Sequence, residues 1–171
     1  MNKTAVFVDV QNIYYTVKQA HHCHFNYSQL WNQLSGEGEI VFALAYAIDR
    51  GDEQQKSFQE ILRQIGFTVR LKPYINRVDG SSKGDWDVGL TIDVIDTIYD
   101  PKAQIDTLVL LSGDGDFDLL LQRVSRDHKI KTIVYGVEAL SARSLIDAAS
   151  EFRPIEGNLL LKKPDPDQAD F

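Results

Sequence analysis

The stretch Leu108-Val109-Leu110-Leu111-Ser112-Gly113-Asp114-Gly115-Asp116-Phe117-Asp118 decides the fold of this chain. Four consecutive apolar residues that run into a glycine-flanked acidic turn are typical of a buried strand that bends sharply before a helix. Glycines on both sides of Asp114 allow the backbone to turn, so that this carboxylate faces a crevice. The stretch therefore predicts a strand over residues 107–111 and a helix over residues 117–126.

The N-terminus repeats this arrangement. The strand-like run of residues 4–8 ends at Asp9, and a helix is predicted over residues 12–20, beginning at Asn12. An aspartate at a strand-to-helix turn is also a favoured helix N-cap, and that interpretation of Asp9 stays open. Two aspartates nevertheless follow two buried strands in the same way, which favours a shared site.

The remaining pattern alternates strands with helices. Strands are predicted over residues 40–47, 67–71 and 132–135, a loop over 75–83, and helices over 28–34, 52–65, 86–99 and 141–149, with Ser141 as an N-cap. Such alternation predicts an α/β fold, a three-layer, doubly wound and mainly parallel sheet. A strand order of 3-2-1-4-5 would make Asp9 and Asp114 neighbours at the switch point, where such sheets bind ligands. Residues 1–158 form the predicted domain, and residues 159–171 are a C-terminal tail, packed at first and then disordered.

A third acidic segment is Lys83-Gly84-Asp85-Trp86-Asp87. At 100° per residue, Asp87 falls in an apolar arc of its helix that also holds Val88, Val94 and Ile98. A carboxylate that points inward is costly unless it is paired or binds a cation. Asp93 lies about 120° away on the same helix, so its role stays open. Asp116 and Asp118 fall in a first helical turn, where the helix dipole alone favours acids.

Converging carboxylates are hard oxygen ligands, of the kind that Mg²⁺ or Mn²⁺ prefers. Other acidic or metal motifs do not fit. An EF-hand loop that starts at Asp114 would have Leu119 in place of glycine and Ser125 in place of glutamate. No phosphate-binding glycine loop is present, and the histidines around Cys23 lack zinc-ligand spacing.

Composition limits the class of protein. The 171 residues are 43% hydrophobic and 25% charged, as in an ordinary globular domain, and no apolar run reaches the roughly 20 residues that span a bilayer. One cysteine and the absence of a signal peptide fit the cytoplasm. The net charge of −7 argues against non-specific coating of nucleic acid. Residues 69–83 are locally basic, which indicates either a phosphate-binding loop or a solvated surface.

Three motifs together carry a family resemblance: Phe7-Val8-Asp9 with Asn12, Lys83 to Leu90 with Asp93, and Ser112 to Phe117. In this combination and order the chain resembles the NYN domains of the PIN-like nuclease superfamily, and among them the LabA-like group. The resemblance implies a doubly wound sheet and RNA cleavage that depends on Mg²⁺ or Mn²⁺. It places Asp9, Asp87, Asp114 and Asp116 in an acidic site, with Asn12 orienting groups beside it.

We therefore predict a metal-dependent ribonuclease whose partner is RNA and which does not act at a membrane. The alternative is a non-catalytic regulatory module that binds RNA or a protein, and a homodimer is left open. Catalysis and metal binding are assigned to Asp9, Asp87, Asp114 and Asp116; supporting roles to Asn12, Ser112, Asp93 and Asp118; and nucleic-acid contacts to Lys83, Arg77 and Arg50.

Overall fold

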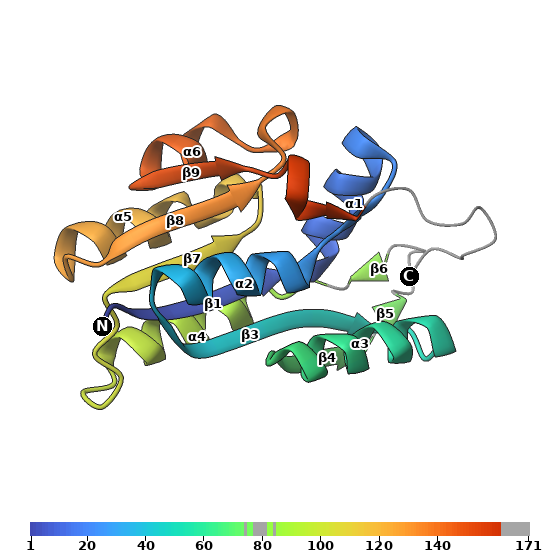
Figure 1. Ribbon diagram of the computed structural model, residues 1–171, viewed down its shortest axis with the longest axis horizontal. Helices are drawn as coiled ribbons and strands as arrows, with labels where there is room; N and C mark the ends of the chain where they lie inside the picture. The colour runs from blue at the N-terminus through green and yellow to red at the C-terminus, as the bar shows by residue number, and fades with distance from the viewer. Residues whose placement is uncertain (74, 77–81, 84, 162–171) are drawn as a thin grey trace.

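A parallel sheet of six strands forms the centre of the molecule (Figure 1). The computed structural model describes residues 1–73, 75–76, 82–83 and 85–161. The strands lie in the order β4-β3-β1-β7-β8-β9. Their bounds are Lys3–Asp9 for β1, Glu39–Asp49 for β3, Thr68–Pro73 for β4, Thr107–Leu111 for β7, Lys131–Gly136 for β8 and Glu151–Pro154 for β9. The predicted α/β class and the order 3-2-1-4-5 of the five expected strands are confirmed, and β9 adds a sixth strand that was not predicted.

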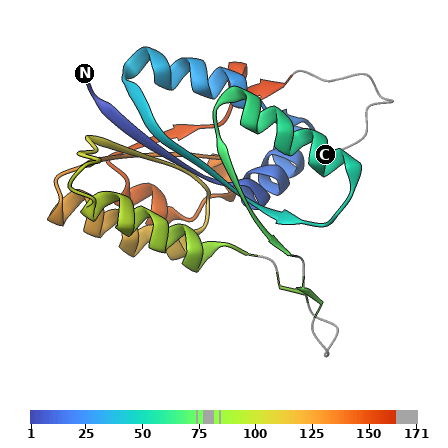
Figure 2. The same cartoon turned by 90° about the horizontal axis from the view of Figure 1, so that it is seen from below.

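Helices cover both faces of this sheet, because successive residues of a strand point to opposite sides. Val6 and Val8 of β1 pack into the core on one face, whereas Ala5 and Phe7 pack into the core on the other. Figure 2 shows α1, α2 and α3 over the first face and α4, α5 and α6 over the second. The helix bounds are Val10–His21 for α1, Tyr27–Glu37 for α2, Glu53–Ile65 for α3, Asp87–Tyr99 for α4, Asp118–Asp127 for α5 and Arg143–Ala148 for α6.

Two short antiparallel pairs lie outside the main sheet. One joins β2 (His24–Phe25) to β10 (Leu160–Leu161), so that the chain beyond residue 158 packs against the domain. The other joins β5 (Ile75–Asn76) to β6 (Ser82–Lys83), within the segment predicted as a loop. Residues 162–171 of the predicted tail lie outside the described residues. Among the helices that the structure describes, none has the length and apolar character needed to cross a membrane.

Two local predictions were wrong, both at the start of a helix. Ser141 is not an N-cap, because its Oγ donates to the Val137 carbonyl at 2.7 Å and α6 begins two residues later. Val88 is 72% exposed instead of facing the core, whereas Leu90 and Val94 form the buried face of α4. A helical wheel assumes a helix that continues on both sides, and Asp87 is instead the first residue of α4.

Candidate metal centre

Asp9 ends β1 and joins two adjacent loops. Its Oδ1 accepts a hydrogen bond from the Asn12 backbone N–H at 3.3 Å, so it caps α1. Its Oδ2 accepts from the Ser112 hydroxyl at 3.1 Å, and Ser112 directly follows β7. Because β1 and β7 are paired neighbours in the sheet, the same carboxylate serves both as the cap and as a link to the second acidic loop.

The loop after β7 is fixed by side chains from both strand ends. The Asp114 backbone N–H donates to Ser112 Oγ at 3.1 Å, and the Gly113 N–H donates to Asn12 Oδ1 at 2.9 Å. A Cβ on Gly113 would lie only 2.8 Å from Ser141 Oγ and 3.0 Å from the Leu140 carbonyl oxygen, so a larger residue would displace this loop. The positions of Asn12, Ser112 and Gly113 thus set the direction of the Asp114 side chain.

Three carboxylates from two loops converge beside Asp9. Asp87, Asp114 and Asp116 each offer an oxygen, and these oxygens all lie within 4.8 Å of one another. We call these three residues the carboxylate trio. Asp114 Oδ1 also accepts from the Asp116 backbone N–H at 2.9 Å, which holds the two in one turn. In the part of the chain that the structure describes, no other group of three acidic, histidine or cysteine side chains converges in this way.

The surroundings favour protonation of two of these acids. Burial raises the pKa of Asp9 to about 6, and the charges of Asp114 and Asp85 add to this effect, against the opposing hydrogen bonds from Asn12 and Ser112. Burial also raises the pKa of Asp87 to about 7, together with the hydrogen bond to Asp114 and the charges of Asp114, Asp9 and Asp85. Crowded carboxylates with raised pKa values are typical of a site that a cation would stabilise.

Metal affinity should therefore depend on pH in the range where these two acids titrate. A carboxylate must lose its proton before it binds a cation, so protons compete with the metal below the raised pKa values. Between about pH 6 and pH 7.5 the apparent affinity for Mn²⁺ is expected to rise on the order of tenfold, since each pKa unit changes the ionised fraction up to tenfold. Isothermal titration at the two pH values measures this change. Equal Mn²⁺ affinities at the two pH values would contradict the raised pKa values of Asp9 and Asp87.

The metal-free protein gives the opposite trend. An acid whose folded-state pKa is raised costs no stability below its unfolded-state pKa, and destabilises the fold as pH rises through its folded-state pKa. From Asp9 and Asp87 we therefore expect the contribution to stability to fall between about pH 4 and pH 7. In Asp87→Asn, the loss of melting temperature over this range should be smaller than in the parent protein.

The other predicted site residues that the structure describes lie outside the carboxylate trio. Asp93 accepts from the Tyr46 hydroxyl at 2.7 Å and pairs with Arg70. Asp118 is the first residue of α5 and lies outside the trio. Arg50 directly follows β3, and its guanidinium donates to the Tyr15 hydroxyl at 3.3 Å. Lys83 belongs to β6, of which the backbone pairing is described, and Arg77 lies outside the described residues.

Trp86 organises cations beside the trio, which the sequence prediction missed. Its Nε1 donates to the Ala47 carbonyl at 2.9 Å, and its ring packs edge-on against Tyr46. Arg70 and Lys72 lie over the same ring, with their charged groups 5.5 and 5.1 Å from a ring centroid. A tryptophan between two aspartates in Asp85-Trp86-Asp87 was the available signal, because aromatic faces attract cations.

Comparison with known proteins agrees with this geometry. The model of the NYN domain family matches residues 3–156. The low amplitude and bright protein LabA of Synechococcus elongatus is 26% identical over 159 residues, which cover 88% of this chain and 82% of that protein. A crystal structure of a Vibrio parahaemolyticus protein of unknown function, VPA0982, is 48% identical and superposes with a TM-score of 0.86 over 94% of this chain and 96% of that one.

Proposed function

The chain belongs to the NYN domain family, and from this premise we propose that it cleaves RNA phosphodiester bonds with the help of Mg²⁺ or Mn²⁺. The observation that carries the proposal is the carboxylate trio, whose oxygens lie within 4.8 Å of one another, with Asp9 linked to it through Ser112. Asp9, Asp87, Asp114 and Asp116 are the proposed catalytic and metal-holding residues.

The donor set fits such an ion. It consists of carboxylate oxygens, which suit hard divalent cations and not the softer zinc or copper ions. The pKa values of Asp87 and Asp9 are raised by burial and by neighbouring acids, so the metal-free site is electrostatically unfavourable. A bound Mg²⁺ or Mn²⁺ supplies Lewis-acid polarisation of a phosphoryl oxygen and makes water more acidic.

The residues around the acids hold them in place. Ser112 receives the Asp114 N–H and donates to Asp9, so one hydroxyl sets the separation of the two strand ends. The Asn12 side-chain oxygen accepts a hydrogen bond from the Gly113 N–H, which also holds the loop after β7 in place. Such positioning matters, because reacting groups must be held close to their productive geometry for catalysis to be efficient.

Cations beside the site would offset the charge of the RNA backbone. Lys72 donates to the Asp85 carbonyl at 3.2 Å and lies over Trp86, so its ammonium group is held next to the segment that leads to Asp87. Arg70 is oriented by its pair with Asp93 and lies over the same ring. We propose these two cations, with Arg50 at the end of β3, as phosphate contacts, in addition to the predicted Lys83 and Arg77.

The test is cleavage of a mixed-sequence, single-stranded RNA by the purified protein. We expect cleavage with millimolar Mn²⁺ or Mg²⁺, none in EDTA, and loss of cleavage in Asp114→Asn. The variant excludes a contaminating nuclease, since it is purified in the same way. Intact RNA under every metal condition would overturn the proposal and leave the non-catalytic binding module as the function of the fold.

A further inference from the structure

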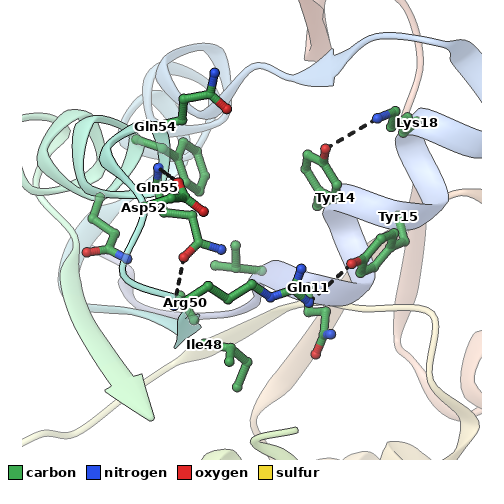
Figure 3. A pocket seen from close by; sticks show the side chains of 13 residues that line it. Gln11, Tyr14, Tyr15, Lys18, Ile48, Arg50, Asp52, Gln54 and Gln55 are labelled. Carbon is green, nitrogen blue, oxygen red and sulfur yellow. Dashed lines mark hydrogen bonds between the residues drawn. The ribbon is translucent and has the colours of Figure 1, made fainter. Parts of the chain in front are cut away.

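A second feature at the carboxyl ends of the strands is a cavity of about 280 Å³ between α1 and α3 (Figure 3). Tyr14, Tyr15 and Gln11 of α1 line one side, and Gln54 and Gln55 of α3 line the other. Its volume is slightly below the roughly 300 to 1,000 Å³ of typical small-ligand pockets, so the cavity is suited to a small group such as one nucleobase.

The cavity adjoins the candidate metal centre through the backbone. Val10 and Gln11, which line it, directly follow Asp9 at the start of α1. Ala47 also lines the cavity, and its carbonyl accepts from Trp86, the residue before Asp87. A nucleic-acid strand whose phosphate lies at the carboxylate trio would therefore have a neighbouring nucleotide within reach of this cavity.

Tyr15 is the tyrosine of the cavity that is suited to stacking on a base. Tyr14 is already stacked on His24, with ring centroids 5.8 Å apart and planes 23° apart. Tyr15 packs edge-on against Tyr14, is 47% exposed, and has its hydroxyl held by Arg50. Its ring is therefore anchored at both ends but is not stacked on another described aromatic. Bases of single-stranded nucleic acid bind such rings in a sequence-tolerant way.

A buried amide points to a polar ligand. Gln59 of α3 lines the cavity and is only 5% exposed. Within residues 1–73, 75–76, 82–83 and 85–161, the only fully buried polar side-chain atom without a hydrogen-bond partner is His128 Nε2, so the Gln59 amide is not sealed in the core. Gln59 lines the cavity, so its amide is placed to hydrogen-bond to a ligand bound there. A glutamine amide offers a donor and an acceptor side by side, which matches the donor and acceptor pattern of a base edge.

We infer that this cavity binds one unstacked nucleobase of single-stranded RNA, beside the phosphate at the candidate metal centre. Tyr15 stacks on the base, and the Gln59 amide hydrogen-bonds to its edge. A base inside a duplex is stacked and paired and does not enter such a cavity, so the cavity accepts only an unpaired nucleotide. This inference rests on the proposed function and adds to it a base-binding subsite between α1 and α3.

The test measures RNA binding instead of cleavage. Fluorescence anisotropy of a labelled, single-stranded RNA dodecamer in Mg²⁺ is recorded on an Asp87→Asn background, which keeps the RNA intact. Adding Tyr15→Ala should weaken binding about 5- to 100-fold, the loss expected for one stacked base. Tyr99→Ala is the matched control, because Tyr99 is 55% exposed and lies on α4, away from the cavity. A duplex of the same sequence should bind more weakly than the single strand.

Gln59→Leu separates a ligand contact from a structural role. Leucine keeps most of the buried aliphatic volume of glutamine and removes the amide, so the melting temperature should change little. RNA binding should nevertheless fall about tenfold. Unchanged binding in both Tyr15→Ala and Gln59→Leu, or no measurable RNA binding by the parent background, would overturn the inference.

The two proposals fail in different ways. RNA binding that depends on Tyr15 and Gln59, without any metal-dependent cleavage by the parent protein, overturns the ribonuclease proposal and supports the base site. If the parent protein cleaves RNA, but neither Tyr15→Ala nor Gln59→Leu weakens RNA binding, the ribonuclease proposal is supported and the base-binding cavity is overturned. Abasic substitution along the dodecamer adds a direct check, because one position should weaken binding to the Asp87→Asn background and have little effect once Tyr15 is alanine.

Discussion

Replacing Asp87 by asparagine is expected to reduce metal-dependent RNA cleavage at least about a hundredfold. Loss of an outer hydrogen-bonding partner of a metal site typically costs roughly 10- to 100-fold, and a residue that itself holds the ion is expected to cost at least the upper value. The metal-free protein should become no less stable and should melt at a higher temperature above about pH 7. The neutral amide removes a half-buried charge that Asp114 and Asp9 repel.

Asp96→Asn is the matched control for this variant. Asp96 lies on the same helix, α4, but is exposed and lies outside the carboxylate trio. It should change neither the cleavage rate nor the metal-induced rise in melting temperature. Steady-state cleavage rates and thermal melts with and without Mn²⁺ provide both measurements. If Asp87→Asn cleaves RNA as fast as the parent protein, Asp87 does not belong to the site.

Replacing Phe117 by alanine is expected to give a large loss of stability, about 3 to 5 kcal/mol in the free energy of unfolding. Phe117 lies between Asp116 and Asp118 and is only 1% exposed, packed in the core beneath α5 and α6. Its loss would leave a cavity directly under the turn that holds Asp114 and Asp116. The stabilisation by Mn²⁺ should therefore decrease as well.

Leu119→Ala is the control for the effect of burial. Leu119 follows two residues later, at the start of α5, and is 72% exposed, so its truncation should change stability by no more than about 0.5 kcal/mol. Urea unfolding of the three proteins gives the comparison. A loss below about 1 kcal/mol in Phe117→Ala would show that this side chain does not anchor the acidic turn.

Local sequence patterns were sufficient to predict five of the six strands of the main sheet. Apolar runs such as that of β7 are specified by burial on both faces, and the alternation of strands and helices predicted a mainly parallel sheet, for which the doubly wound order 3-2-1-4-5 was the expected one. The convergence of Asp114 and Asp87 was also expected from their motifs, although their catalytic role stays a prediction. Partners distant in sequence could not be predicted. The pairing of Asp93 with Tyr46 and Arg70 depends on how α4 packs across β3 and β4. The pairing of β2 with β10 depends on how the C-terminal segment packs against the segment after α1.

The cavity between α1 and α3 shows the same limit. Gln11, Tyr15 and Gln59 follow no local motif, because residues of two helices line the cavity together only after α1 and α3 pack on the sheet. In the sequence, Gln59 occupies an amphipathic helix and resembles any surface glutamine. Only its burial in the structure distinguishes it.

The two outermost strands affect how copies of the protein can associate. An unpaired sheet edge can recruit a strand from another molecule, and natural proteins block this with charge, proline and short length. β4 carries Arg70 and Lys72 and ends at Pro73, and β9 is only four residues long and ends at Pro154. Both borders of the sheet are thereby protected against intermolecular strand addition. A homodimer of this protein should therefore form through its helical faces, and the sheet should not continue from one copy into the next.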